Sequence, residues 1–323
     1  MEKPLKEAAH PMARHPWRVV LWPVVIVLAV AAVVVTGGSF YMLDYSLAPI
    51  PARADTASRY ARLYKRYPET RPWVDSLRSI QGLRDTFLTM PGGERHHALC
   101  VNRGSRKTAL VLHGWRNCAV DILFLARMYE RDFGYNVVVP DFHAHGLSEG
   151  EAIRMGWLDR LDMLYWLQQF KADTMVVHGV SMGGATTMMM SGEKLPEGIR
   201  DVRFVDDCGY TSVWDEFTGE LQKQFGLPKF PLMYTASLLC KLRYGWAFDE
   251  ASALRQVARC RYPMLFIHGS RDSFVPTEMV RRLYRAKPAP KELWITENTR
   301  HALSYKDHRA EYVRRVGAFL NRR

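Results

Sequence analysis

Hydrophobic and polar residues divide the chain into zones with different periodicity. The first is an apolar stretch, Val19 to Leu43, which contains no charged residue. As a helix it would be about 37 Å long at 1.5 Å per residue, enough to cross the hydrocarbon core of a bilayer. Aromatic rings suited to membrane interfaces lie at its two ends, at Trp17, Trp22, Tyr41 and Tyr45. The pattern predicts a transmembrane helix over residues 17–43, preceded by an N-terminal tail, residues 1–16.

A cleaved signal peptide is the alternative for this stretch. The apolar run is longer than a signal-peptide core and no A-x-A site follows it, which favours an uncleaved single-pass anchor. Basic residues before the stretch favour a cytoplasmic N-terminus, with the rest of the chain on the periplasmic or extracytoplasmic side, namely Lys3, Lys6, Arg14 and Arg18. Basic residues that follow it reduce this asymmetry, namely Arg53, Arg59, Arg62, Lys65 and Arg66.

Residues 44–82 are predicted to form a helical stalk. Ala54 to Arg66 has helical spacing with an apolar face and a basic face, and prolines and a glycine interrupt the chain after it, at Pro68, Pro72 and Gly82. We expect this segment to fold against the domain that follows, residues 83–323.

From residue 83 the pattern becomes that of strands, then of strands alternating with helices. Two apolar runs, Phe87 to Met90 and His97 to Val101, flank a Pro-Gly-Gly turn and predict a β-hairpin. Trp157 to Phe170 has helical spacing. Short apolar runs predict further strands at Thr108–Leu112, Asn136–Val139, Met175–Val177, Arg203–Val205, Met264–Ile267 and Glu292–Ile295. This alternation predicts an α/β fold, a mostly parallel sheet with helices on both faces.

One stretch breaks this alternation. Between Tyr210 and Ala258 about fifty residues separate consecutive strands, more than one connecting helix requires. The stretch is apolar on one side, and Leu227-Pro228 and Phe230-Pro231 would bend it. We expect a small helical lid insertion at about residues 211–258.

Composition limits the classes of partner and cofactor. The chain has 323 residues, of which 48% are hydrophobic, enough for one large core. The net charge of +12 comes from scattered residues, and no nucleic-acid motif is present, so no nucleic-acid partner is expected. The five cysteines contain no C-x-x-C pair, which argues against a zinc site. In an oxidising compartment one disulfide could form, and the odd number would leave a free thiol. The glycine fingerprints of phosphate-binding loops are absent.

The strongest local signal is Gly179-Val180-Ser181-Met182-Gly183, between a predicted strand and a helix-forming segment. This is the pattern of a nucleophile elbow, in which a sharp turn exposes the hydroxyl of Ser181, while Gly179 and Gly183 let the strand and helix approach closely. The pattern G-x-S-x-G also occurs by chance in a turn that only ends a strand. The neighbouring motifs must therefore show whether this one carries a catalytic serine.

A second element, His113-Gly114-Trp115, ends the strand Thr108–Leu112. Hydrolysis through a serine needs backbone N–H groups that bind the oxyanion of the tetrahedral intermediate. We expect the amides of Trp115 and Met182 to form this oxyanion hole. His113 is expected to brace the loop, and a plain strand terminator is the alternative for the motif.

An acid and a base complete the candidate site. Asp272 follows the strand Met264–Ile267, and His301 follows Glu292–Ile295. The order Ser181, Asp272, His301 and the position of each at the carboxyl end of a strand predict a catalytic triad. Less favoured alternatives are Asp206 or Asp207 as the acid and His268 or His308 as the base. His178 is expected to be a packed core histidine.

With these motifs in place, the chain from about Phe87 onward resembles the α/β-hydrolase superfamily. The likeness is greatest to lid-bearing bacterial members with an N-terminal membrane segment, described as serine-aminopeptidase-like or esterase-like. Residues 140–148, P-D-F-H-A-H-G-L-S, are similar to the family's P-D-x-x-x-H-G-x-S stretch, which is structural and borders the pocket. The chain differs from the family in having larger residues beside the site, at Thr299, Arg300, Trp115 and Arg116.

The resemblance and the local chemistry together imply a membrane-anchored serine hydrolase that needs no cofactor or metal. Its expected substrate is a small-molecule or lipid-like acyl ester or thioester. Acidic residues in the lid leave a serine aminopeptidase or amidase as an alternative, since they could hold a substrate amine, at Asp215, Glu216, Glu220, Asp249 and Glu250. A membrane-anchored binding protein that lost catalysis is a further alternative. Dehalogenase and epoxide-hydrolase chemistry is disfavoured, because it needs a carboxylate at position 181.

Overall fold

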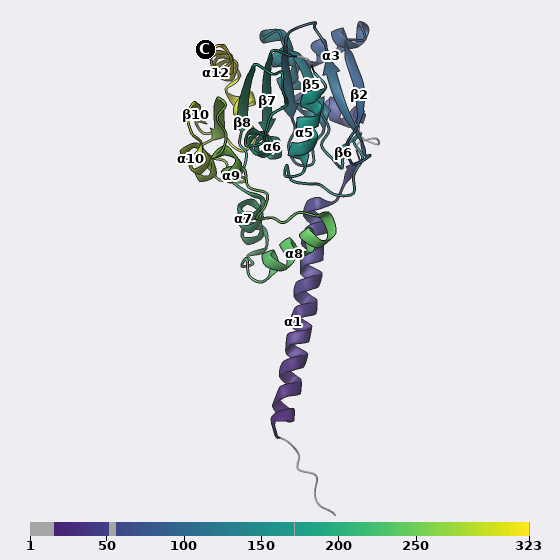
Figure 1. Ribbon diagram of the computed structural model, residues 1–323, viewed down its shortest axis with the longest axis vertical. Coiled ribbons are helices and arrows are strands. Elements are labelled where there is room, and N and C mark those ends of the chain that lie inside the picture. The colour runs from purple at the N-terminus through teal and green to yellow at the C-terminus, as the bar shows by residue number, and fades with distance from the viewer. Residues whose placement is uncertain (1–15, 52–55, 171, 323) are drawn as a thin grey trace, which may run out of the picture.

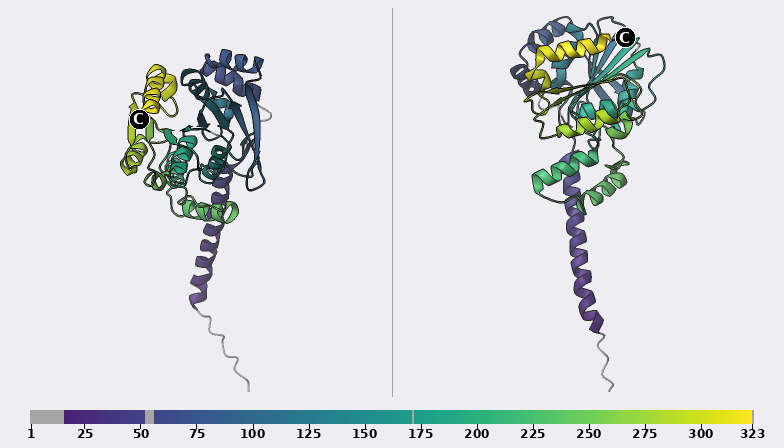
Figure 2. Two further views of the ribbon diagram at one scale, coloured as in Figure 1. Left: turned by 45° about the horizontal axis from the view of Figure 1, so that its top comes forward. Right: turned by 90° about the vertical axis from the view of Figure 1, so that its left-hand side faces the viewer.

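A long apolar helix, α1, projects from an α/β domain in the computed structural model of the chain (Figure 1). The structure describes residues 16–51, 56–170 and 172–322. The predicted N-terminal tail lies almost wholly outside the described residues, as do the first basic residues flanking the anchor, Lys3, Lys6 and Arg14. The C-terminal helix lies on the side of the domain away from α1 (Figures 1 and 2).

The domain is built on an eight-stranded sheet with the order β10-β9-β8-β7-β4-β5-β3-β2. Its strands are β2 Leu83–Thr89, β3 Arg95–Val101, β4 Lys107–Leu112, β5 Asn136–Pro140, β7 Thr174–Val180, β8 Asp201–Asp207, β9 Met264–Gly269 and β10 Lys291–Thr296. The hairpin β2–β3 is antiparallel and β3 pairs antiparallel with β5, whereas the other pairs are parallel. This confirms the predicted fold class. The parallel strands are rich in Val, Leu and Phe because both faces of the sheet are covered.

Two hydrophobic cores lie on opposite faces of this sheet. Helices of the first core are α5 Asp159–Gln168, α6 Met182–Ser191, α9 Ala253–Val257 and α10 Thr277–Ala286. Helices of the second are α2 Thr56–Arg66, α3 Thr70–Ser79, α4 Leu123–Arg127, α11 Ser304–Asp307 and α12 Arg309–Asn321. Shorter elements complete the chain: β1 Ile50–Pro51, η1 Ala119–Ile122, η2 Met128–Asp132 and β6 His145–Gly146. The two short strands β1 and β6 pair in parallel, which ties the chain after α1 to the domain.

The segment predicted as a stalk packs on the domain as two helices. Leu63 of α2 and Trp73 and Val74 of α3 are buried in the second core, and the Trp73 indole N–H donates to Glu130 Oε2 at 2.8 Å. Pro72 lies in the first turn of α3, where its missing N–H costs nothing. An amphipathic pattern does not distinguish a helix that serves as a spacer from one that packs on a domain. In this chain the segment packs on the domain and covers its second core.

Helix α1 spans Pro16–Leu47 and therefore continues past the predicted anchor boundary at Leu43. Its segment Leu21–Leu47 is long and apolar enough to cross a membrane. Residues 21–34 are exposed, whereas one face of the last turns is covered, and Leu43 and Leu47 are buried in the first core. The helix therefore has a bare portion and a portion built into the domain.

The predicted lid is a helical insertion between β8 and β9, containing α7 Val213–Phe225 and α8 Leu232–Tyr244. The Ser212 hydroxyl caps α7 by accepting from the Asp215 N–H at 3.0 Å, and Gly226 ends it with φ +66°. Met233 and Ala236 of α8 are buried. Both helices lie beside the domain end of α1 (Figures 1 and 2).

Candidate active site

Ser181 lies at the turn between β7 and α6 with φ +59° and ψ −119°, a strained conformation for a residue with a side chain. A Cβ on Gly179 would lie 2.0 Å from the Gly183 carbonyl oxygen, and one on Gly183 would lie 2.2 Å from that of Leu112. Only glycine fits at these two positions, because the strand and the helix cross within contact distance. The turn is held by the Ser181 N–H, which donates to the Asp207 carbonyl at 2.8 Å.

The structure brings the three predicted side chains together. The Ser181 Oγ lies 2.8 Å from His301 Nε2, and His301 Nδ1 lies 2.6 Å from Asp272 Oδ2. Each comes from a loop after a different parallel strand: β7, β9 and β10. In this geometry the Ser181 O–H is placed to donate to Nε2 of the ring, and an Nδ1–H is placed to donate to the Asp272 carboxylate.

The surroundings of Asp272 keep its carboxyl group ionised. Its Oδ1 accepts from the N–H groups of Phe274 and Val275 at 3.0 and 2.9 Å. Burial alone would raise the pKa of Asp272, but hydrogen bonds from His268 and His301 outweigh it and lower the pKa to about 2. His268 also lies against the Val275 carbonyl, 2.9 Å from its Nε2, so it supports the acid and does not reach the serine.

The predicted oxyanion loop runs beside Ser181. A Cβ on Gly114 would lie 3.5 Å from the Cβ of Ser181. Met182 is the first residue of α6, so its N–H has no partner within the helix. His113 braces the loop as expected, because its Nε2 accepts from the Phe142 N–H at 3.1 Å.

Two hydrogen bonds tie this loop to the end of α1, which the sequence did not suggest. The indole N–H of Trp115 donates to the Ser46 carbonyl at 3.0 Å, and the Arg116 guanidinium donates to the Tyr45 carbonyl at 3.0 Å. These carbonyls belong to the last turn of α1, where helix carbonyls lack partners within the helix. The bulk of Trp115 and Arg116 is therefore explained by this contact.

The P-D-F-H-A-H-G segment is structural, as expected. Asp141 accepts from the N–H groups of Ala119 and Leu147 at 2.7 and 2.8 Å, and it lies 2.7 Å from the Nδ1 of His97. The Asp141 carboxylate thus links three segments: the start of η1, strand β3 and the loop that follows β5.

Among the described residues, the side chains of the alternative acids and bases bond to partners other than the Ser181 hydroxyl. Asp207 accepts from the Tyr312 hydroxyl at 2.8 Å, and burial raises its pKa to about 6. His308 Nε2 lies 2.8 Å from the Thr299 hydroxyl. His178 is buried, 2.9 Å from the hydroxyl groups of Tyr129 and Tyr312, as expected of a core histidine.

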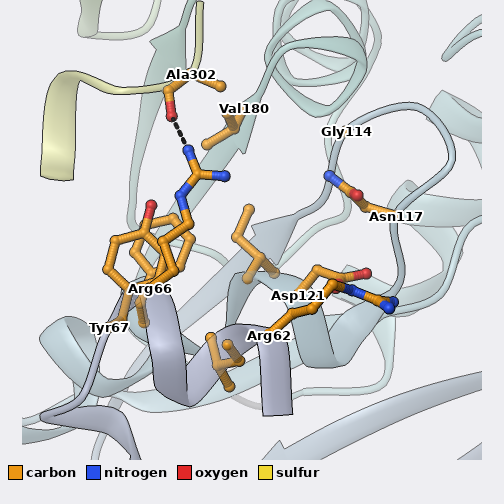
Figure 3. A pocket seen from close by; sticks show the side chains of 11 residues that line it. Arg62, Arg66, Tyr67, Gly114, Asn117, Asp121, Val180 and Ala302 are labelled. Carbon is orange, nitrogen blue, oxygen red and sulfur yellow. Dashed lines mark hydrogen bonds between the residues drawn. The ribbon is translucent and has the colours of Figure 1, made fainter. Parts of the chain in front are cut away.

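A cavity of about 270 Å³ is lined by residues next to two triad members in the chain (Figure 3). Val180 and Ala302, the chain neighbours of Ser181 and His301, line one side, and Arg62 and Arg66 of α2 line another. The Arg66 guanidinium reaches the Ala302 carbonyl at 3.5 Å. The helix predicted as a stalk therefore forms a wall of the space beside the site.

Glu216 of α7 is the most unusual acid of the lid. It is buried, and neither carboxylate oxygen has a hydrogen-bond partner in the described part of the chain. Burial, reinforced by the charges of Glu220 and Asp272, raises the pKa of Glu216 well above its usual value. The sequence marked it only as one acid among several in the lid.

A possible metal-ligand group coincides with the triad. Cys208, Asp272 and His301 each place a ligand atom within 4.8 Å of the others. The atoms of Asp272 and His301 already join in the triad hydrogen bonds, and burial raises the pKa of the Cys208 thiol, which opposes the thiolate that a metal requires. The closeness of these three residues is therefore better explained by the triad hydrogen bonds than by a metal site. All five cysteines are free.

Several known proteins are similar to this chain in sequence or in fold. The model of the alpha/beta hydrolase family matches residues 109–315. The Bacillus subtilis protein YqkD is 30% identical over 219 residues, covering 66% of this chain and 71% of that protein. A Saccharomyces cerevisiae membrane protein, YNL320W, is 24% identical over 195 residues, covering 58% of this chain and 62% of that protein.

Solved structures with the same fold include esterases. The Pyrococcus furiosus esterase Pf2001 has a TM-score of 0.59 and 25% identity, covering 74% of this chain and 90% of that chain. The Exiguobacterium antarcticum esterase EaEST has a TM-score of 0.54 and 16% identity, covering 74% of this chain and 100% of that chain, a likeness of fold alone.

Proposed function

Since this chain belongs to the alpha/beta hydrolase family, we propose that it is a membrane-anchored serine hydrolase that cleaves an acyl ester or thioester through Ser181. The observation that carries this proposal is the continuous hydrogen-bonded line from the Ser181 hydroxyl through His301 to Asp272. A binding protein that had lost catalysis would have no need of this arrangement, so we favour the enzyme.

In the proposed mechanism, His301 Nε2 takes the proton of the Ser181 hydroxyl while the oxygen attacks the substrate carbonyl carbon. The Nδ1–H donated to Asp272 holds the ring in the required tautomer and stabilises the imidazolium. His301 then gives its proton to the leaving oxygen or sulfur as the acyl bond breaks. Water repeats the cycle on the acyl-enzyme, which releases the acid and restores Ser181.

The Trp115 and Met182 amides are the proposed oxyanion donors. The closeness of Gly114 to Ser181 and the start of α6 at Met182 support this assignment of the two amides. Donors fixed in advance for charge that appears only in the transition state contribute about 3 to 4 kcal/mol each. The bonds from Trp115 and Arg116 to the end of α1 would help to fix this loop.

We propose that α1 is an uncleaved single-pass anchor, with the N-terminus cytoplasmic and the hydrolase domain extracytoplasmic. Its length and apolar surface support the span, and the basic residues before it support the orientation. An anchored site lies near the bilayer, which suits a lipid-like acyl substrate.

Aminopeptidase or amidase activity on the same triad is the second candidate. Glu216 favours it, because a buried acid without a partner could pair with the amine of a substrate. In this case Glu216→Gln would lower turnover of aminoacyl amides and spare simple esters.

A substrate panel tests the proposal on the detergent-solubilised full chain. We expect hydrolysis of acyl esters of graded chain length by the native protein and none by Ser181→Ala. Faster turnover of aminoacyl amides, abolished by Glu216→Gln, would replace the esterase by the amidase. Absence of turnover on every ester, thioester and amide would contradict both.

A further inference from the structure

Helix α8 carries a row of exposed apolar side chains on one face. Tyr234, Leu238 and Leu242 follow one another at intervals of four residues, and Phe230 precedes them by the same interval. Phe230 is 71% exposed and Leu242 is 74% exposed. We call Phe230, Tyr234, Leu238 and Leu242 the α8 stripe. The opposite face of α8 is buried in the domain, so the stripe is not part of the core.

The contact between α8 and α1 sets the height of α8 along the anchor. A Cβ on Gly38 would lie 3.2 Å from Leu232 Cδ1, and the Ser39 hydroxyl lies 3.4 Å from the Leu232 carbonyl oxygen. The first turn of α8 is therefore level with Gly38 and Ser39 on α1.

Aromatic rings on α1 indicate where the two membrane surfaces lie. Trp22 and Tyr41 are about 28 Å apart along the axis at 1.5 Å per residue, close to the hydrocarbon thickness of a bilayer. Gly38 is about 4.5 Å below Tyr41, inside this interval. Beyond Tyr41, Asp44 lies 3.9 Å from Arg243, at the level where charged groups meet lipid headgroups.

From the contacts of α8 with α1 and the positions of these rings, we propose that the α8 stripe inserts at the boundary between the lipid acyl chains and the headgroups, deepest at its first turn, on the membrane face from which the domain emerges. The occupant of this surface is phospholipid of the bilayer that α1 spans. A helix is stable in the membrane interface when its apolar face points toward lipid and its polar face points toward water. The inference rests on the proposed span of α1.

This second attachment would fix the orientation of the domain. Helix α7 precedes α8 and holds the loop of the triad acid, because Lys223 donates to the Ser273 carbonyl at 2.8 Å. A lid seated in the interface therefore holds the site at a constant height above the lipid, whereas α1 alone would leave the domain free to tilt.

Depth-dependent fluorescence quenching tests the inference on the full chain in phosphatidylcholine vesicles. Leu238→Cys and Leu242→Cys, each labelled with an environment-sensitive dye, are compared with two controls. Ile80→Cys is matched in exposure at 71% and follows α3, on the far side of the domain (Figure 1). Val27→Cys lies in the bare part of α1. Native cysteines contribute little label, because four are buried and Cys100 is partly buried.

With nitroxide on the upper acyl carbons of the lipid, we expect several-fold stronger quenching at Leu238 and Leu242 than at Ile80. Quenching at Val27 but not at the stripe would overturn the inference and leave the anchor standing. A blue shift without quenching would mean that a second copy of the chain covers the stripe, which also overturns it. Absence of quenching at Val27 would overturn the span itself. Thermal melting of each variant confirms that it is folded.

Discussion

The sheet edge formed by the carboxyl ends of the parallel strands, where Ser181 lies, and the layer formed by α1, α7 and α8 are held together by different kinds of contact. At the sheet edge, Ser181, His301 and Asp272 are joined by hydrogen bonds of 2.6 and 2.8 Å. In the lid and anchor layer the helices pack through apolar side chains on one face and leave apolar side chains exposed on the other. Hydrogen bonds therefore position the polar atoms of the candidate site, whereas apolar packing joins the lid helices to α1.

The largest effect is expected at the sheet edge. Asp272→Asn should keep the shape of the site but favour the wrong histidine tautomer, so kcat should fall by about 10⁴-fold. Asp249→Asn, an exposed acid in the lid, is the matched control and should leave kcat unchanged. Steady-state hydrolysis of one ester by both variants checks this, and an equal fall in the two would contradict the assigned acid.

In the lid and anchor layer the expected loss is of stability. Leu43 is 1% exposed and lies in the core beside α8, so Leu43→Ala should cost about 3 kcal/mol through lost burial and a residual cavity. Val33→Ala changes an exposed position on the same helix and should cost little. Thermal unfolding in detergent micelles measures both. Equal melting temperatures would show that α1 does not pack on the domain.

A smaller effect should appear where the two regions meet. Trp115→Phe removes the indole N–H bonded to the Ser46 carbonyl, a loss of about 1 kcal/mol, and would loosen the oxyanion loop. We expect kcat to fall several-fold while KM changes little. Trp214→Phe in α7 is the matched aromatic change. The same fall in both variants would mean that the bond to α1 does not position the loop.

The last effect concerns the pH dependence of stability, at the sheet edge behind Ser181. Burial raises the pKa of Asp206 to about 7. The folded state therefore holds this proton more tightly than the unfolded state, so its contribution to stability is full below pH 3.8 and is lost as pH rises toward 7. Asp206→Asn should remove this dependence. Melting temperatures of both proteins from pH 5 to 8 check it, and parallel curves would refute the assignment.

The sequence predicted the sheet edge better than the lid and anchor layer because recognisable motifs mark the residues of the candidate site. The elbow is a local pattern, since Gly179 and Gly183 flank Ser181, and the order of strands then locates Asp272 and His301. In contrast, the Trp115 bond to Ser46 joins residues 69 positions apart, and the Ser39 contact with Leu232 spans 193. No local pattern encodes such contacts.

The segment 44–82 is a second case in which the sequence predicted the element but not all of its contacts. Its apolar face predicted a helix that folds against the domain, and α2 and α3 do so. The pattern could not show that α2 also lines the cavity beside Ser181, because Arg62 and Arg66 have the same spacing on a stalk as on a cavity wall. The isolation of Glu216 likewise depends on neighbours from distant parts of the chain.

Covalent labelling shows whether the hydroxyl of Ser181 is the nucleophile. The full chain, solubilised in detergent, is treated with a fluorophosphonate, digested and analysed by mass spectrometry. The account predicts one phosphonylated residue, Ser181, with labelling slowed strongly in His301→Gln and absent in Ser181→Ala. Modification of a different serine, or rapid labelling that does not depend on His301, would contradict it.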